Sequence, residues 1–154
     1  MEHRFLLDVM LGKLTTYLRM CGYDTLYAQE EGLEADAAIC ERAASTGRRL
    51  LTRDRDLAAR TDNAVLLTAR DTEGKLAELQ AHGIEIDLPA HPDRCSVCNG
   101  RLDRIDPDHR PAHAPDSVSR LWQCGQCDQY FWKGSHWECV QETIAAIPTS
   151  NLDD

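Results

Sequence analysis

Residues 3–28, HRFLLDVMLGKLTTYLRMCGYDTLYA, hold the pattern that decides the fold class. The run HRFLLD at residues 3–8, with its apolar centre, predicts a strand. Apolar residues at helical spacing over residues 10–21 predict a helix that ends before Gly22. The run DTLYA at 24–28 then predicts a second strand. Short strands that alternate with helices are typical of an α/β protein with a parallel sheet.

The same alternation continues to residue 88. The further predicted elements are helices at 36–46, 55–60 and 73–81, strands at 48–52 and 64–68, and the extended run IEIDL at 84–88. Pro89 and Pro92 mark a change of composition. We therefore expect a main domain over residues 1–89 and a smaller one over 90–154, with a helix to about Ile147 and a frayed end, TSNLDD.

Two matched cysteine pairs stand in the second domain, Cys95-x2-Cys98 and Cys124-x2-Cys127. Two such pairs supply the four sulfurs, at roughly 2.3 Å, of a closed tetrahedral Zn²⁺ site. The sequence opens without a signal-peptide pattern, so disulfides are the less favoured alternative and the expected compartment is the cytoplasm. We expect zinc here to be structural, in a zinc ribbon, with neither His136 nor Cys139 as a ligand.

Charge and hydropathy limit the classes of function. The formal net charge is -9, and a strongly acidic protein is not a natural binder of polyanions, so any contact with nucleic acid must be local. No apolar run approaches the ~18 residues that a membrane span needs, so no membrane partner is expected. No nucleophile triad, glycine-rich phosphate loop or dinucleotide fingerprint is found.

Three aspartates fall at corresponding places in the predicted α/β pattern. Asp8 and Asp54 follow strands, and Asp36 begins a helix. Ligands of open α/β sheets gather beyond the carboxyl ends of the strands, so these carboxylates are expected to converge. Clustered carboxylates repel one another unless a cation lies among them, and their oxygens suit Mg²⁺ or Mn²⁺. Such a site fits phosphodiester hydrolysis, whereas a plain helix N-cap is the alternative for Asp36 and Asp8.

Several stretches of the chain resemble one known family. They are RFLLDVMLGKLTTYLRMCGYDT, DAAICERA, RRLLTRDRDL, RCSVCNGRL and WQCGQCDQYFWKGSHW, and with the closing helix the resemblance extends from about Arg4 to Ile147. They are similar to the PIN-like ribonuclease domain in the branch called the Mut-seven C-terminal RNase domain family. The resemblance implies a PIN-like three-layer α/β/α fold with a central, mostly parallel sheet and a C-terminal zinc ribbon. It also implies metal-dependent ribonuclease activity, for which we expect single-stranded RNA as substrate.

The resemblance also implies which residues form the site. It makes Asp8, Asp36 and Asp54 the catalytic, metal-binding carboxylates, and it marks four neighbours as substrate contacts: Lys13, Arg19, Thr52 and Arg53. Lys13 and Arg19 would hold phosphates, Arg53 would contact phosphate or pair with the acids, and Thr52 would orient a carboxylate or a water. A fourth acidic position of classical PIN nucleases has no clear counterpart, and we interpret Asp56 as a helix N-cap.

Two alternatives to the enzyme remain open. One is a non-catalytic RNA- or ribosome-binding protein, and the other is a protein-interaction module whose ribbon docks an unknown partner. The aromatic cluster of Trp122, Tyr130, Phe131, Trp132 and Trp137 also has two interpretations. It could stack bases, or it could be the small core that joins the ribbon to the main domain, which the low aromatic content favours.

Overall fold

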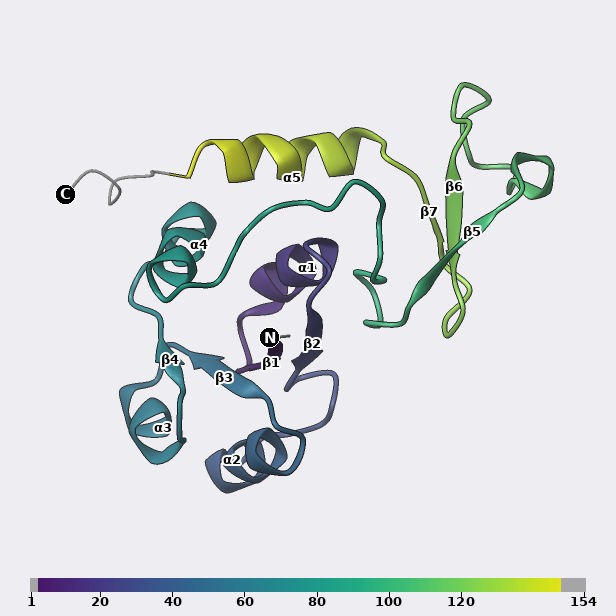
Figure 1. Cartoon of the computed structure of the whole chain (residues 1–154). Helices are drawn as coiled ribbons and strands as arrows, with labels where there is room; N and C mark the ends of the chain where they lie inside the picture. The colour runs from purple at the N-terminus through teal and green to yellow at the C-terminus, as the bar shows by residue number, and fades with distance from the viewer. Residues whose placement is uncertain (1–2, 148–154) are drawn as a thin grey trace.

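Four short parallel strands form the central sheet of the first part of the chain (Figure 1). The computed structural model describes residues 3–147. The strands are β1 (Arg4–Leu7), β2 (Asp24–Tyr27), β3 (Arg49–Thr52) and β4 (Val65–Leu66), and their order across the sheet is β2-β1-β3-β4. This sheet confirms the predicted α/β fold class with its parallel strands.

Helices cover both faces of the sheet (Figure 1). On one face lie α1 (Gly12–Met20) and α4 (Thr72–Ala81), and on the other lie α2 (Asp36–Ser45) and α3 (Arg55–Arg60). The side chains of β1 alternate between these layers, with Phe5 and Leu7 in the α1/α4 core and Leu6 in the α2/α3 core. All three are fully buried, as expected for a strand covered on both faces. The α/β/α layering is therefore observed.

The second part of the chain is an antiparallel sheet followed by a helix. Its elements are β5 (Leu102–Ile105), the 3-10 helix η1 (Pro107–His109), β6 (Leu121–Cys124), β7 (Tyr130–Phe131) and α5 (Ser135–Ala145). We call the part formed by the loops of the two cysteine pairs and the sheet β5-β6-β7 the ribbon. Helix α5 runs from it across the top of the α/β layers in Figure 1. Its Trp137 and Val140, with Ile147 just beyond it, belong to the same hydrophobic core as Phe5. The second part therefore shares the core of the first.

Local signals fixed some boundaries better than others. Helix α1 ends where predicted, because Gly22 adopts a φ of 95° that few other residues tolerate. The run IEIDL joins neither sheet, although Ile84 and Ile86 are buried in the core. The predicted boundary near Pro89 stays a prediction, and the expected fraying of TSNLDD falls outside the described residues. Within residues 3–147 the helices are too short or too polar to cross a membrane.

Candidate active site and metal centre

Asp8 and Thr52 meet at the carboxyl edge of the sheet. Strands β1 and β3 are paired with Leu7 beside Leu51, so the next residue of each strand also comes alongside. The Thr52 hydroxyl donates to Asp8 Oδ2 at 2.7 Å, and the Val9 N–H donates to Asp8 Oδ1 at 2.8 Å. Thr52 is fully buried. Strand pairing therefore fixes the direction of the Asp8 carboxylate, and Thr52 orients a carboxylate as predicted.

Asp54 is joined to the same threonine through its backbone. Its N–H donates to Thr52 Oγ at 3.0 Å, while its own Oδ1 accepts from the N–H groups of Asp56 and Leu57 at 2.9 and 3.1 Å. Asp54 is thus the N-cap of α3, and Asp56 lies in the first turn. The interpretation of Asp56 as the cap was wrong, because α3 begins at Arg55. Asp54 Oδ2 accepts no hydrogen bond from the residues that the structure describes.

Asp36 pairs with an arginine and has no hydrogen bond to Thr52. It is the first residue of α2, preceded by Ala35 at the cap position. Its Oδ2 lies 3.5 Å from Arg60 Nη1, and both side chains are about half exposed. Among residues 3–147, the ligand atoms of Asp8, Asp36 and Asp54 do not form a group within 4.8 Å of one another. The structure therefore brings Asp8 and Asp54 to one threonine but pairs Asp36 with an arginine.

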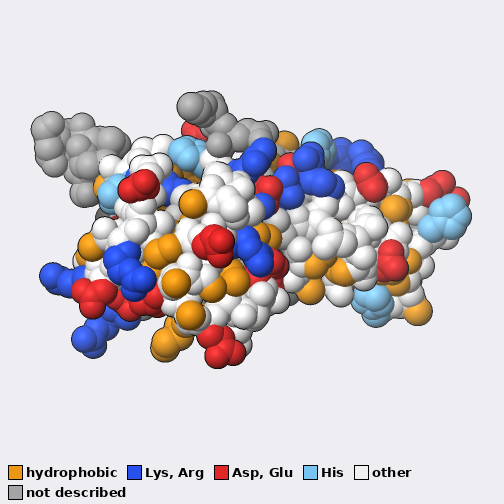
Figure 2. Space-filling view, turned by 90° about the horizontal axis from the view of Figure 1, so that it is seen from below, with side chains coloured by type: hydrophobic (Ala, Val, Ile, Leu, Met, Phe, Trp, Pro, Cys, Tyr) orange, Lys and Arg blue, Asp and Glu red, His pale blue; other side chains and the backbone are white. Residues whose placement is uncertain are grey.

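Two of the predicted substrate contacts are exposed near this edge. Lys13 lies in the first turn of α1, a few residues after Asp8, and Arg53 lies between Thr52 and Asp54. Figure 2 shows basic and acidic side chains interspersed over one face of the molecule, with several basic side chains gathered in the upper middle of the view. Next to Asp8, Thr52 and Asp54 in the chain, Lys13 and Arg53 are thus the exposed cations of the predicted set.

Tyr27 and Met10 were missed as residues of this edge. Tyr27 ends β2, and its hydroxyl accepts from the Met10 N–H at 3.2 Å and donates to Gln29 Oε1 at 3.0 Å. Met10 has a φ of 75°, and its side chain is 89% exposed. The strand-end rule that selected Asp8 also applies to Tyr27. It could have been found from the sequence, whereas the Met10 backbone conformation could not.

Arg19 lies in a buried junction between the two parts of the chain. Its side chain is 2% exposed, and its guanidinium donates to the carbonyls of Thr25, Ser96 and Val97 and to Glu30 Oε1. Four polar contacts around a buried side chain leave no free face for a phosphate. This burial contradicts the predicted contact of Arg19 with substrate. Arg19 instead joins the end of α1 to residues 94–99, the loop of the first cysteine pair, which we call the first cysteine loop.

Asn99 and Asp24 continue this junction along the edge strand β2. Asn99 Oδ1 accepts from the Thr25 N–H at 2.9 Å, and Asn99 Nδ2 donates to Asp24 Oδ1 at 2.7 Å. Burial would raise the pKa of Asp24, but hydrogen bonds from Arg48 and Asn99 outweigh it, so the pKa is lowered. The first cysteine loop therefore covers the open side of β2, which would otherwise expose unpaired backbone groups.

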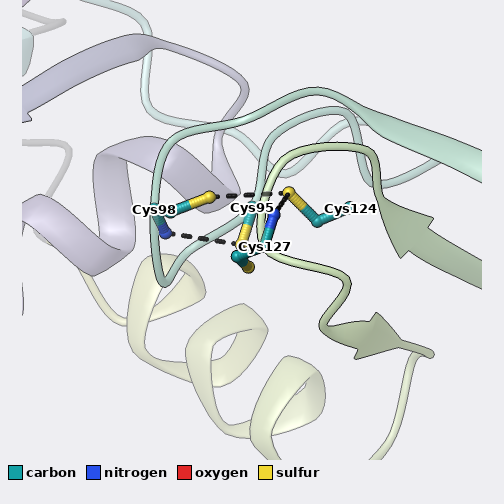
Figure 3. A group of neighbouring side chains, drawn as sticks. All are labelled: Cys95, Cys98, Cys124 and Cys127. Atoms are coloured by element: carbon teal, nitrogen blue, oxygen red, sulfur yellow. Dashed lines mark hydrogen bonds between the residues drawn. The ribbon is translucent and has the colours of Figure 1, made fainter.

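The four cysteines of the two CxxC pairs converge on one point (Figure 3). Their sulfurs all lie within 4.8 Å of one another, with Cys95 Sγ 3.7 Å from Cys127 Sγ and Cys98 Sγ 3.5 Å from Cys124 Sγ. Neither His136 nor Cys139 belongs to the group, as expected. The cluster fits Zn²⁺, because four thiolates around one point satisfy its tetrahedral preference.

Backbone N–H groups prepare two of these sulfurs for metal. Cys95 Sγ accepts from the N–H groups of Val97 and Cys98, and Cys124 Sγ accepts from those of Gln126 and Cys127. Burial raises the pKa of Cys95 to about 12. Burial also acts to raise the pKa of Cys124, but the N–H groups outweigh it and lower the value to about 7. The two loops thus have the same backbone arrangement, in which two N–H groups favour the thiolate form of one sulfur in each pair.

The Mut7-C RNAse domain model matches residues 3–144 of the chain. The chain belongs to this family. The match spans both the sheet with its carboxyl edge and the cysteine cluster, so the two parts form one family unit. Comparisons with curated proteins and with solved structures found no match. Membership of the Mut7-C RNAse domain family supports a ribonuclease-type function with RNA as substrate.

Proposed function

We propose that the protein is a metal-dependent ribonuclease that hydrolyses phosphodiester bonds of single-stranded RNA at the carboxyl edge of its sheet. The observation that carries this proposal is the Thr52 hydroxyl, which donates to Asp8 and accepts from the backbone of Asp54. It places two carboxylate residues at adjacent strand ends, in a chain of an RNAse domain family.

The carboxylates at this edge fit Mg²⁺ or Mn²⁺. These ions are commonly held by one or two carboxylates together with water, so Asp8 and Asp54 suffice as protein ligands. Asp36 would become a third ligand if its carboxylate released Arg60. The Asp36–Arg60 ion pair, at 3.5 Å, is exposed and therefore weak. When bound, such a metal activates water and stabilises charge on the phosphate.

The chain's own side chains supply positioning and charge. Thr52 holds the Asp8 carboxylate in one direction, which limits the reorientation needed on binding. Lys13 and Arg53, both exposed, contact phosphates of the RNA. The four cysteines bind a structural Zn²⁺ that holds the ribbon together. None of the seven cysteines, all of which the structure describes, forms a disulfide, which fits action in the reducing cytoplasm.

A second candidate function is RNA binding without cleavage. The observation that favours it is the pairing of Asp36 with Arg60, together with the use of Asp54 Oδ1 as a helix cap. In that case the carboxylates have ordinary structural roles, and Lys13 and Arg53 still contact RNA.

Cleavage of a fluorescent single-stranded RNA, with Mn²⁺ or without added divalent metal, tests the two candidates. We expect Mn²⁺-dependent cleavage that Asp54→Asn reduces at least 100-fold. Asn caps helices about as well as Asp, so this variant removes the charge and keeps the cap. Asp56→Asn is the matched control, since Asp56 lies two positions on in the first turn of α3. Equal cleavage by both variants would reject the carboxyl edge as the site of cleavage. Binding of the RNA without any cleavage would favour the second candidate.

A further inference from the structure

A cavity lies between the ribbon and the α/β layers, on residues that the proposed reaction does not use. Its volume is about 360 Å³, within the range of small-molecule sites. The first cysteine loop contributes Arg94 and Val97, β7 contributes Phe131, and the start of α5 contributes His136. Met20, the last residue of α1, closes it on the side of the main domain. Four parts of the chain therefore line this cavity.

Three consecutive aromatic residues belong to the lining of the cavity. Tyr130, Phe131 and Trp132 line it, and all three are only half-buried. None of them belongs to either hydrophobic core of residues 3–147, whereas the neighbouring Trp137 does. The aromatic cluster is therefore divided: Trp137 joins the ribbon to the main domain, Trp122 is buried within the ribbon sheet, and the remaining three are half-buried residues that line the cavity.

The charge of the cavity differs from that of the protein. The chain has 26 acidic and 17 basic residues, yet no Asp or Glu of the described residues lines this space. Its one arginine, Arg94, donates to the Asn99 carbonyl and lies 4.0 Å from the Asp24 carboxylate. Half-buried aromatic residues in a space that no carboxylate lines suit a flat ligand that stacks on them. A nucleotide base is such a ligand, and no acidic side chain of the lining repels its phosphate.

We infer that this cavity is a base-binding subsite for a nucleotide of the single-stranded RNA, held away from the scissile bond. This inference rests on the proposed ribonuclease function and extends it. Helix α1 gives the spacing, because Lys13 stands in its first turn and Met20 at its end. Seven residues at 1.5 Å each separate the two by about 10 Å along the helix. An RNA of several nucleotides reaches both places, and a dinucleotide does not.

Binding of two oligomers tests the subsite without any cleavage. The probes are a fluorescein-labelled ten-nucleotide RNA with 2′-O-methyl riboses and the same oligomer with abasic residues, measured by anisotropy on zinc-loaded protein without Mg²⁺ or Mn²⁺. We expect the abasic oligomer to bind at least tenfold more weakly, because it keeps the phosphates and loses the stacking. Equal binding of the two would overturn the inference, and this measurement needs no variant.

Variants of Trp132 test whether the contribution of the bases to binding arises in the cavity. We expect Trp132→Ala to weaken binding of the intact oligomer about tenfold and Trp132→Phe, which keeps a ring, to weaken it less than threefold. The control is His113→Ala, because His113 contacts the Trp132 and Tyr130 rings but does not line the cavity. Each variant is first checked for bound zinc. Loss of binding in the control alone, or stronger binding of an apolar peptide than of RNA, would contradict the subsite.

Kinetics separate this inference from the proposed function. On a cleavable ten-nucleotide RNA we expect Trp132→Ala to raise KM about tenfold with kcat unchanged, and on a dinucleotide we expect no change. If the wild-type protein binds through bases and cleaves nothing, the subsite stands and the nuclease proposal fails. If it cleaves and Trp132→Ala behaves as wild type, the subsite fails and the nuclease proposal stands.

Discussion

The cysteine cluster and the carboxyl edge are both candidate metal sites, but they are organised differently. Four sulfurs converge within 4.8 Å, whereas Asp8 and Asp54 are linked through Thr52 and Asp36 pairs with Arg60. Thiols can be neutral, so they can gather without repulsion. Carboxylates are charged near pH 7 and repel one another unless donors or cations hold them. The protein therefore assembles a sulfur site through its loops alone, whereas two of its candidate oxygen ligands share a threonine and the third pairs with an arginine.

Loss of a zinc ligand is the largest effect that we expect. Cys124→Ser should abolish stoichiometric zinc and the cooperative unfolding of the ribbon, because structural zinc contributes about 10 kcal/mol or more in small zinc-binding peptides. Zinc content and thermal unfolding followed by circular dichroism measure this. The matched control is Cys139→Ser, an exposed thiol on α5 outside the cluster. Normal zinc content in Cys124→Ser would show that the four sulfurs are not the ligand set.

Removal of the Arg19 side chain should come next. Arg19→Ala leaves the carbonyls of Thr25, Ser96 and Val97 without their donor, and we expect a loss of about 3 kcal/mol in the free energy of unfolding. Lys13→Ala, on the same helix but exposed, should change stability by less than about 0.5 kcal/mol. Urea unfolding measures both. If the two variants lose equal stability, the junction does not depend on Arg19.

The two metal-site candidates and the Arg19 junction show which features the local sequence predicts and which it does not. The cysteine cluster follows from local spacing, and Asp8 follows from the rule for strand ends, so both were found. The burial of Arg19 depends on a loop 77 positions away, and nothing in its own helix indicates that loop. Asn99 was missed for the same reason, since its partner Thr25 is 74 positions distant. Contacts between the two parts of the chain are thus the information that local pattern lacks.

Thr52→Val tests whether the hydrogen bonds of the Thr52 hydroxyl orient Asp8 and Asp54 for metal binding. The change removes the donor to Asp8 and the acceptor for the Asp54 N–H at nearly constant volume, and we expect Mn²⁺ affinity to fall about 10- to 100-fold. Stability should fall by about 1–2 kcal/mol. Titration calorimetry with Mn²⁺ and urea unfolding measure the two effects. Thr15→Val is the control, because Thr15 is an equally buried threonine whose hydroxyl bonds only to the Leu11 carbonyl of α1. Equal Mn²⁺ affinity in both variants would assign Thr52 a structural role alone.

The smallest expected effect concerns the cap of α3. Asp54→Ala should cost about 1 kcal/mol of stability, because the N–H groups of Asp56 and Leu57 lose their acceptor. Asp54→Asn should cost almost nothing, since the amide oxygen replaces that acceptor, and Asp56→Ala should cost less than about 0.5 kcal/mol. If Asp54→Asn keeps full stability and loses Mn²⁺ binding, the cap and the ligand are separate duties of one carboxylate, with Oδ1 serving the helix and Oδ2 serving the metal. If it loses neither, Asp54 is a cap only, and the contrast with the cysteine cluster becomes one between a metal site and an ordinary sheet edge.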